Sequence, residues 1–181
     1  MTALEAAGDF SLISFTKIPI SILTGIFVGG VVGYCKGKVK VGEVVAKNCK
    51  NSGNIVFQAK STVKCNSIGG VFGATPVHTT DGFKNTGMFL GCENSGNVTY
   101  TIGVNSDGSY TNIGGVIGYC EGDLKSCKNS GKVAHSNNTS SAVACTRPAV
   151  GGVAGCVGYS MTDCENAGAV EFDGYTKHGA S

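Results

Sequence analysis

Short stretches in which apolar and polar residues alternate recur along the chain, and each is typical of a half-buried β-strand. Every stretch follows a turn motif and contains β-branched residues. The four stretches are Asn54-Ile55-Val56-Phe57, Asn97-Val98-Thr99-Tyr100, Lys132-Val133-Ala134 and Ala169-Val170-Glu171-Phe172. A second set of short strands is predicted on a glycine-rich motif upstream of each turn. No stretch longer than the first few residues has the pattern of a capped amphipathic helix, so we expect an all-β protein.

The predicted strands belong to a repeat with two signatures. The first is Gly-Gly-Val, which occurs at residues 29–31, 69–71, 114–116 and 151–153. The second is Cys-x-Asn-Ser-Gly, which follows at residues 49–53, 92–96, 127–131 and, with Ala in place of Ser, 164–168. The distance from the first Gly to the Cys is 20, 23, 13 and 13 residues. A spacing that varies in this way indicates two separate elements joined by loops that tolerate insertions.

Strands this short cannot bury a core within one repeat, whereas stacked repeats can share a continuous one. We therefore predict a parallel β-solenoid of four imperfect repeats, each forming about two coils of about 20 residues. The whole chain of 181 residues is expected to be a single repeat domain. Its repeats are expected at about 28–67, 68–112, 113–149 and 150–181, after a leading strand segment at 1–27.

One apolar run has the composition of a membrane helix. Residues 18–34 contain no charge, and three glycines in this run are spaced four residues apart. However, the segment at 28–35 (VGGVVGYC) recurs at 113–120 (IGGVIGYC), where the flanking residues are polar. We therefore interpret 28–35 as a buried strand with its turn. A membrane or signal role for residues 10–27 stays open as an alternative.

Composition narrows the functional classes. The chain has 29 glycines, only 14% charged residues and a net charge of +2, with no run of like charges. Binding to nucleic acid or to an anionic membrane is therefore not expected. There is no tryptophan, and the other aromatic residues are scattered. No stacking platform for bases or sugars is visible in the sequence.

Nine cysteines are many for this length and favour an oxidising compartment. A zinc site is not expected, because neither Cys-x-x-Cys pairs nor matching histidines occur. Two hypotheses remain for the cysteines of the repeat. They could form disulfides across one coil, for example Cys120 with Cys127 and Cys156 with Cys164. Alternatively, they could form a ladder of small buried thiols that face the core.

Two further columns are predicted along the stack. The asparagines of the second signature would lie above one another, and their amides could hydrogen-bond along a ladder or cap the turn. These residues are Asn51, Asn94, Asn129 and Asn166. The position before each asparagine alternates between Lys and Glu: Lys50, Glu93, Lys128 and Glu165. With two coils per repeat these charges would be about 10 Å apart, where solvent and salt screen them.

The sequence offers no catalytic, cofactor-binding or metal-ligating residue, and we expect a protein that is not an enzyme and needs no cofactor. The acidic residues are spread through the turns instead of clustering on one face. His78, His135 and His178 occupy unrelated contexts, with no matched position in the repeat and no nucleophile at a suitable spacing.

The order Gly-Gly-Val-x-Gly-Tyr followed by Cys-x-Asn-Ser-Gly-x-Val, over residues 28–172, resembles the GLUG-type repeats of bacterial cell-surface and secreted proteins. Such repeats recur in large Bacteroidetes surface proteins. The resemblance implies an extracellular repeat region that acts as an adhesin stalk or accompanies a separate catalytic domain, and it carries over no catalytic residue. The second copy departs from the pattern at Phe72-Gly73-Ala74, where the Tyr-Cys pair is absent.

From the resemblance we expect a non-catalytic module at the cell surface or outside the cell, for adhesion or as a structural spacer. Host or surface glycans and proteins are the partners that such a role implies. Two alternatives stay open: a glycan-binding accessory region of a larger secreted enzyme, and a self-assembling fibre subunit. The second arises because the ends of a solenoid without caps expose strand edges that invite end-to-end association.

Overall fold

The computed structural model describes residues 26–35, 43–59, 65–75, 87–102, 110–137 and 148–173. These residues form twenty short strands and no helix. The strands make five parallel sheets of four strands each, and every sheet takes one strand from each repeat. The chain is therefore a parallel β-solenoid, as its repeat predicts. The leading segment at 1–27 lies almost wholly outside the described residues.

Each repeat forms one coil of five strands. Coil 1 contains β1 (Ile26–Gly29), β2 (Val32–Tyr34), β3 (Val44–Lys47), β4 (Lys50–Asn51) and β5 (Ile55–Ala59). Coil 2 contains β6 (Cys65–Gly69), β7 (Phe72–Thr75), β8 (Met88–Leu90), β9 (Glu93–Asn94) and β10 (Val98–Ile102). Coil 3 contains β11 (Tyr110–Gly114), β12 (Ile117–Cys120), β13 (Asp123–Lys125), β14 (Lys128–Asn129) and β15 (Val133–Asn137). Coil 4 contains β16 (Pro148–Gly151), β17 (Ala154–Val157), β18 (Met161–Thr162), β19 (Glu165–Asn166) and β20 (Val170–Phe172).

The expectation of two coils per repeat is wrong. Every strand pairs with the equivalent strand of the neighbouring repeat, as Ile68 does with Val28 on one side and Ile113 on the other. Consecutive coils are therefore a whole repeat apart in sequence. The chain turns one corner of each coil at a residue with positive φ: Asn48, Gly91, Ser126 and Asp163. These corners link five short strands into one wide coil.

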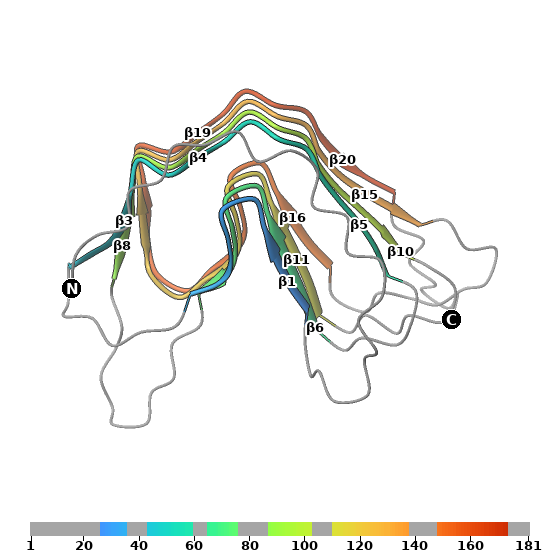
Figure 1. Ribbon diagram of the computed structural model, residues 1–181, viewed down its shortest axis with the longest axis horizontal. Helices are drawn as coiled ribbons and strands as arrows, with labels where there is room; N and C mark the ends of the chain where they lie inside the picture. Colours follow the sequence, from blue (N-terminus) through green and yellow to red (C-terminus); the bar gives the residue numbers. More distant parts are fainter. Residues whose placement is uncertain are drawn as a thin grey trace, which may run out of the picture.

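Each coil folds back on itself in cross-section (Figure 1). Its last three strands, β3 to β5 in coil 1, form an outer arch, and its first two strands, β1 and β2, form an inner arc beneath it. The arches and arcs of the four coils follow one another in register. Every outer arch therefore lies over the inner arc of its own repeat, and this places the two sequence signatures close together.

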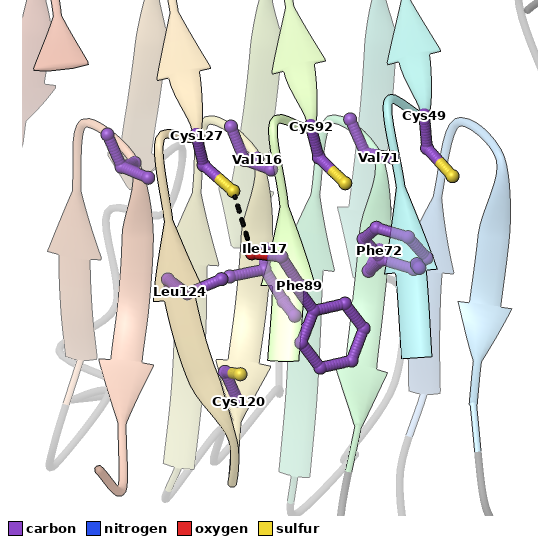
Figure 2. Close-up of a cluster of buried hydrophobic side chains, with 12 residues drawn as sticks. Cys49, Val71, Phe72, Phe89, Cys92, Val116, Ile117, Cys120, Leu124 and Cys127 are labelled. Atoms are coloured by element: carbon purple, nitrogen blue, oxygen red, sulfur yellow. Dashed lines mark hydrogen bonds between the residues drawn. The ribbon is translucent and has the colours of Figure 1, made fainter. Parts of the chain in front are cut away.

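Two apolar cores fill the space between arc and arch. The first core holds Phe72, Phe89, Ile117, Leu124 and four cysteines among its buried side chains (Figure 2). Phe72 packs edge-on against Phe89, with 5.2 Å between the ring centroids. The second core lies between the sheets of β1 and β5 and includes Ile68, Ile113 and Tyr100. Burial of each large aliphatic side chain contributes about 1.5–3 kcal/mol to the free energy of unfolding.

The glycines of the first signature permit close backbone approach inside the inner arc. A Cβ on Gly114 would lie 2.0 Å from the carbonyl oxygen of Ile117, and one on Gly118 would lie 2.5 Å from the backbone nitrogen of Ile68. The second glycine of each signature faces the outer arch: a Cβ on Gly115 would lie 2.2 Å from Cγ of Asn129. A larger residue in place of Gly115 would force arc and arch apart, whereas one in place of Gly114 or Gly118 would disturb the packing within the inner arcs.

Candidate functional site

The asparagines of the second signature form a continuous hydrogen-bonded ladder along the stack. Each side-chain amide nitrogen donates to the amide oxygen of the next coil: Asn51 to Asn94 at 2.8 Å, Asn94 to Asn129 at 2.9 Å and Asn129 to Asn166 at 2.8 Å. Each Nδ2 also donates to the carbonyl oxygen of the glycine two residues later, at 2.6–2.7 Å. The sequence predicted a ladder or a cap of the turn, and the structure has both.

The ladder connects coils and also joins arch to arc within a coil. Asn94 is buried and its side chain lies against Gly70. A Cβ added to Gly70 would lie 2.3 Å from Cγ of Asn94. The same contact relates Gly30 to Asn51 in coil 1. One amide per repeat therefore holds the neighbouring coils, the Asn-Ser-Gly turn and the tip of the inner arc. The recurrence of both signatures follows from this shared contact.

The cysteines of the second signature form a column of thiols that faces the first core. Cys49, Cys92 and Cys127 are fully buried and point the same way in successive coils (Figure 2). Cys127 donates to the carbonyl oxygen of Phe89, with 3.5 Å from Sγ to oxygen. Free thiols are carried by Cys35, Cys49, Cys92, Cys120, Cys127, Cys156 and Cys164. Of the two hypotheses, the ladder of buried thiols is confirmed for Cys49, Cys92 and Cys127.

The proposed disulfides, Cys120 with Cys127 and Cys156 with Cys164, are absent from the described residues. Cys120 ends strand β12 and lies at the opposite end of the first core from Cys127, so the two side chains do not meet (Figure 2). Burial raises the pKa of the Cys120 thiol to about 11. Burial also raises the pKa of Cys164. Thiols with raised pKa values are protonated at neutral pH and are poor nucleophiles, as expected of packing residues.

Alternating charges line the outer face of the sheet formed by β4, β9, β14 and β19. Lys50 Nζ lies 2.9 Å from Glu93 Oε2, and Lys128 Nζ lies 3.1 Å from Glu165 Oε2. The predicted alternation is confirmed, but the expected separation of about 10 Å is wrong, because neighbouring repeats are one coil apart instead of two. These side chains are about half exposed, so each ion pair stabilises the fold by at most about 1 kcal/mol.

A polar groove of about 760 Å³ runs along this charged face. Its walls carry the two ion pairs, the edge of the asparagine ladder and a row of serines, Ser52, Ser95 and Ser130. The groove crosses all four coils, with Lys and Glu alternating from coil to coil and serine in three coils replaced by Ala167 in the fourth. Such a repeating surface offers donors and acceptors to an extended polar ligand, and it is the candidate binding site of the described residues.

A column of rings runs through the second core. Phe57, Tyr100, His135 and Phe172 occupy the same register position in successive coils. Their ring centroids are 5.8, 5.5 and 5.0 Å apart along the column. His135 therefore does occupy a matched position of the repeat, and the earlier interpretation of this histidine is wrong. The signal was present in the sequence, since each residue is the third of the strand that follows the turn.

Among the described residues, polar side chains interrupt the second core in its two middle coils. Asn66 donates to the hydroxyl oxygen of Tyr100 at 3.2 Å, and Thr111 is the register partner of Asn66 in the next coil. Four buried atoms here have no hydrogen-bond partner: Asn66 Oδ1, Thr111 Oγ1 and both ring nitrogens of His135. Burial lowers the pKa of His135 below its ordinary value of 6.5. Sequence reasoning missed this cluster.

The described residues offer no metal site. They contain no cluster of three or more His, Cys, Asp or Glu side chains arranged to hold a metal ion. His78 and His178 lie outside the part of the chain that the structure describes. In that part, no helix is long and apolar enough to cross a membrane. The membrane or signal alternative for residues 10–27 falls almost wholly outside it.

Comparisons with protein families, with curated proteins and with solved structures found no match to this chain. The fold itself therefore defines the class: a parallel β-solenoid repeat protein with one coil per repeat. The features that could serve a function are the outer polar groove and the strand edges at the end of the stack. Each is built from residues that the repeat places at equivalent positions.

Proposed function

We propose that this chain is a non-catalytic structural module, a spacer or adhesion region of a bacterial surface protein. The asparagine ladder is the observation that carries the proposal. In every coil the residues that recur in the repeat serve stacking. The asparagines form hydrogen bonds between coils, the cysteines pack in the first core, and the glycines leave room for the asparagine side chains. A repeat whose distinctive residues all serve stacking is suited to building length and stiffness.

The stack grows in proportion to the number of repeats. Neighbouring parallel strands lie about 4.8 Å apart, so four coils give roughly 19 Å of axial length. Each coil is joined to the next by backbone bonds in five sheets and by one side-chain amide bond. Bending such a rod would break several of these bonds at once. A stiff element of this kind suits a stalk that holds another domain away from a surface.

The extracellular location rests on the resemblance to GLUG-type repeats. The high cysteine count no longer supports it, because packing in the first core accounts for the buried thiols without disulfides. Surface proteolysis and fractionation of the native cells test the location. We expect the chain in the surface or secreted fraction, and recovery from the cytosol alone would overturn this part of the proposal.

The outer groove favours a second candidate function, a glycan-binding accessory region. Its serine recurs in three successive coils and its Lys–Glu pair recurs every second coil, which gives a periodic surface suited to the periodic units of a polysaccharide. A glycan array probed with the purified chain separates the candidates, with Ser95→Tyr as the variant that fills the groove and Ser160→Tyr as an exposed control outside it. A passive spacer binds nothing. Binding that Ser95→Tyr alone abolishes would establish the accessory role instead.

A further inference from the structure

The polar cluster of the second core differs between coil 2 and coil 3. In coil 2 the side chains of Asn66 and Tyr100 meet directly, because Asn66 Nδ2 donates to the Tyr100 hydroxyl oxygen at 3.2 Å. In coil 3 the register partner of Asn66 is Thr111, and that of Tyr100 is His135. Coil 3 therefore has a threonine and a histidine where coil 2 has an asparagine and a tyrosine.

Both side chains of the coil 3 pair are the smaller ones. Threonine lacks the amide group of asparagine, and the five-membered imidazole is shorter than a phenol with its hydroxyl. The sheets on the two sides of the second core continue in register through both coils. Thr111 and His135 therefore leave room between them at the place that the hydroxyl oxygen of Tyr100 occupies in coil 2.

Four polar atoms of the cluster have no hydrogen-bond partner in the chain. They are Asn66 Oδ1, Thr111 Oγ1 and both ring nitrogens of His135. Asn66 and Thr111 are 0% exposed and His135 is 2% exposed, so bulk solvent does not reach them. Buried polar atoms in native proteins are nearly always hydrogen-bonded, because leaving them unpaired destabilises the fold. These atoms call for a partner that is not a residue.

Apolar residues enclose the cluster along the stack. The two matched positions hold Ile26 and Phe57 in coil 1 and Pro148 and Phe172 in coil 4. The imidazole of His135 is itself neutral at neutral pH, because burial lowers its pKa below the ordinary value of 6.5. An ion is costly to bury in such surroundings. The partner must therefore be small and uncharged, and it must both donate and accept hydrogen bonds.

We infer that coil 3 binds an internal water molecule between Thr111 and His135, with its oxygen at the place of the Tyr100 hydroxyl in coil 2. The water accepts a hydrogen bond from the Thr111 hydroxyl and donates to the unprotonated ring nitrogen of His135. Asn66 Oδ1, about 4.8 Å away by one coil step, accepts its second hydrogen. Three protein partners are typical of a buried water. This water joins β11 to β15 as the Asn66–Tyr100 bond joins β6 to β10.

The sign of one stability change tests the site. Thr111→Val replaces the hydroxyl with a methyl group of similar size. With the water bound, the variant loses a hydrogen bond, and its unfolding equilibrium constant in urea at pH 7.5 should rise about two- to tenfold. A hydroxyl without a partner would give the opposite result, because its removal stabilises the fold. Thr99→Val corrects for the change of residue type, since Thr99 faces outward between the buried Val98 and Tyr100.

Oxygen-17 magnetic relaxation dispersion counts long-lived internal waters directly. The wild-type chain is compared with Thr111→Asn/His135→Tyr, which rebuilds the coil 2 pair in coil 3. The double variant should have one long-lived water fewer. His135→Phe, which inserts the ring of coils 1 and 4, replaces it in the comparison if the double variant does not fold, with the same expected loss. Equal numbers of long-lived waters would overturn the inference, as would an unfolding constant that Thr111→Val leaves unchanged or lowers.

Discussion

The asparagine ladder allows a prediction with an internal control. Asn94 lies in the middle of the ladder and is buried. It accepts a bond from Asn51 at 2.8 Å and donates to Asn129 at 2.9 Å and to the Gly96 carbonyl oxygen at 2.6 Å. Asn94→Ala removes three hydrogen bonds and leaves two buried acceptors, Asn129 Oδ1 and the Gly96 carbonyl oxygen, without this donor.

The magnitude follows from these contacts. Three lost bonds at about 1 kcal/mol each, with the added cost of unsatisfied buried acceptors, lower the free energy of unfolding by about 3–5 kcal/mol. The matched control is Asn166→Ala at the exposed end of the same ladder. It loses the bond from Asn129 and the bond to the Gly168 carbonyl oxygen, and water can replace both. We expect a loss of about 1 kcal/mol there.

Urea unfolding in reducing buffer, followed by far-ultraviolet circular dichroism, measures both variants. The midpoint of Asn94→Ala should fall well below that of Asn166→Ala, with similar slopes in denaturant. Equal losses for the two variants, or a loss under about 1 kcal/mol for Asn94→Ala, would show that the ladder is incidental to stability. The reasoning about the recurring asparagine would then be wrong.

Two further predictions concern the second core and the inner arc. Because burial lowers the pKa of His135 below 6.5, the unfolded chain binds a proton that the folded chain does not as the pH falls below about 6.5. As the pH falls from about 6.5 to the pKa of His135 in the folded chain, the free energy of unfolding should therefore decrease, by at most about 1.4 kcal/mol per pH unit. Urea unfolding at pH 7.5 and 5 should show a smaller decrease for His135→Phe. An unchanged decrease would show that His135 is not its source. Gly115→Ala places a Cβ 2.2 Å from Cγ of Asn129 and should lower the free energy of unfolding by more than about 2 kcal/mol. The control is Gly158→Ala, whose Cβ would lie 3.6 Å from the nearest atom and should change the free energy of unfolding by less than about 1 kcal/mol in the same assay. Equal effects of the two substitutions would refute the close approach of Gly115 to Asn129.

The sequence and the structure agree where a residue's partner is its own equivalent in the next repeat. The asparagines, the cysteines and the Lys-Glu alternation could all be placed in columns, because recurrence at one place of a repeat implies stacking. His135 escaped this reasoning, since its side chain differs in kind from Phe57, Tyr100 and Phe172. Asn66 and Thr111 escaped it too, because they match neither each other nor a motif.

By itself the sequence determined the all-β solenoid, its four repeats and the columns of asparagine and cysteine, and it left open whether those cysteines form disulfides or free thiols. The turns and the alternating strands are set by residues close together in the sequence, so they form in any arrangement that stacks the repeats. Only the tertiary structure decided that each repeat makes one wide coil, and so placed Lys50 within 2.9 Å of Glu93. The number of coils depends on which distant strands pair, and the contact of Gly115 with Asn129 joins segments separated by a loop of variable length. Spacing along the chain does not encode that pairing.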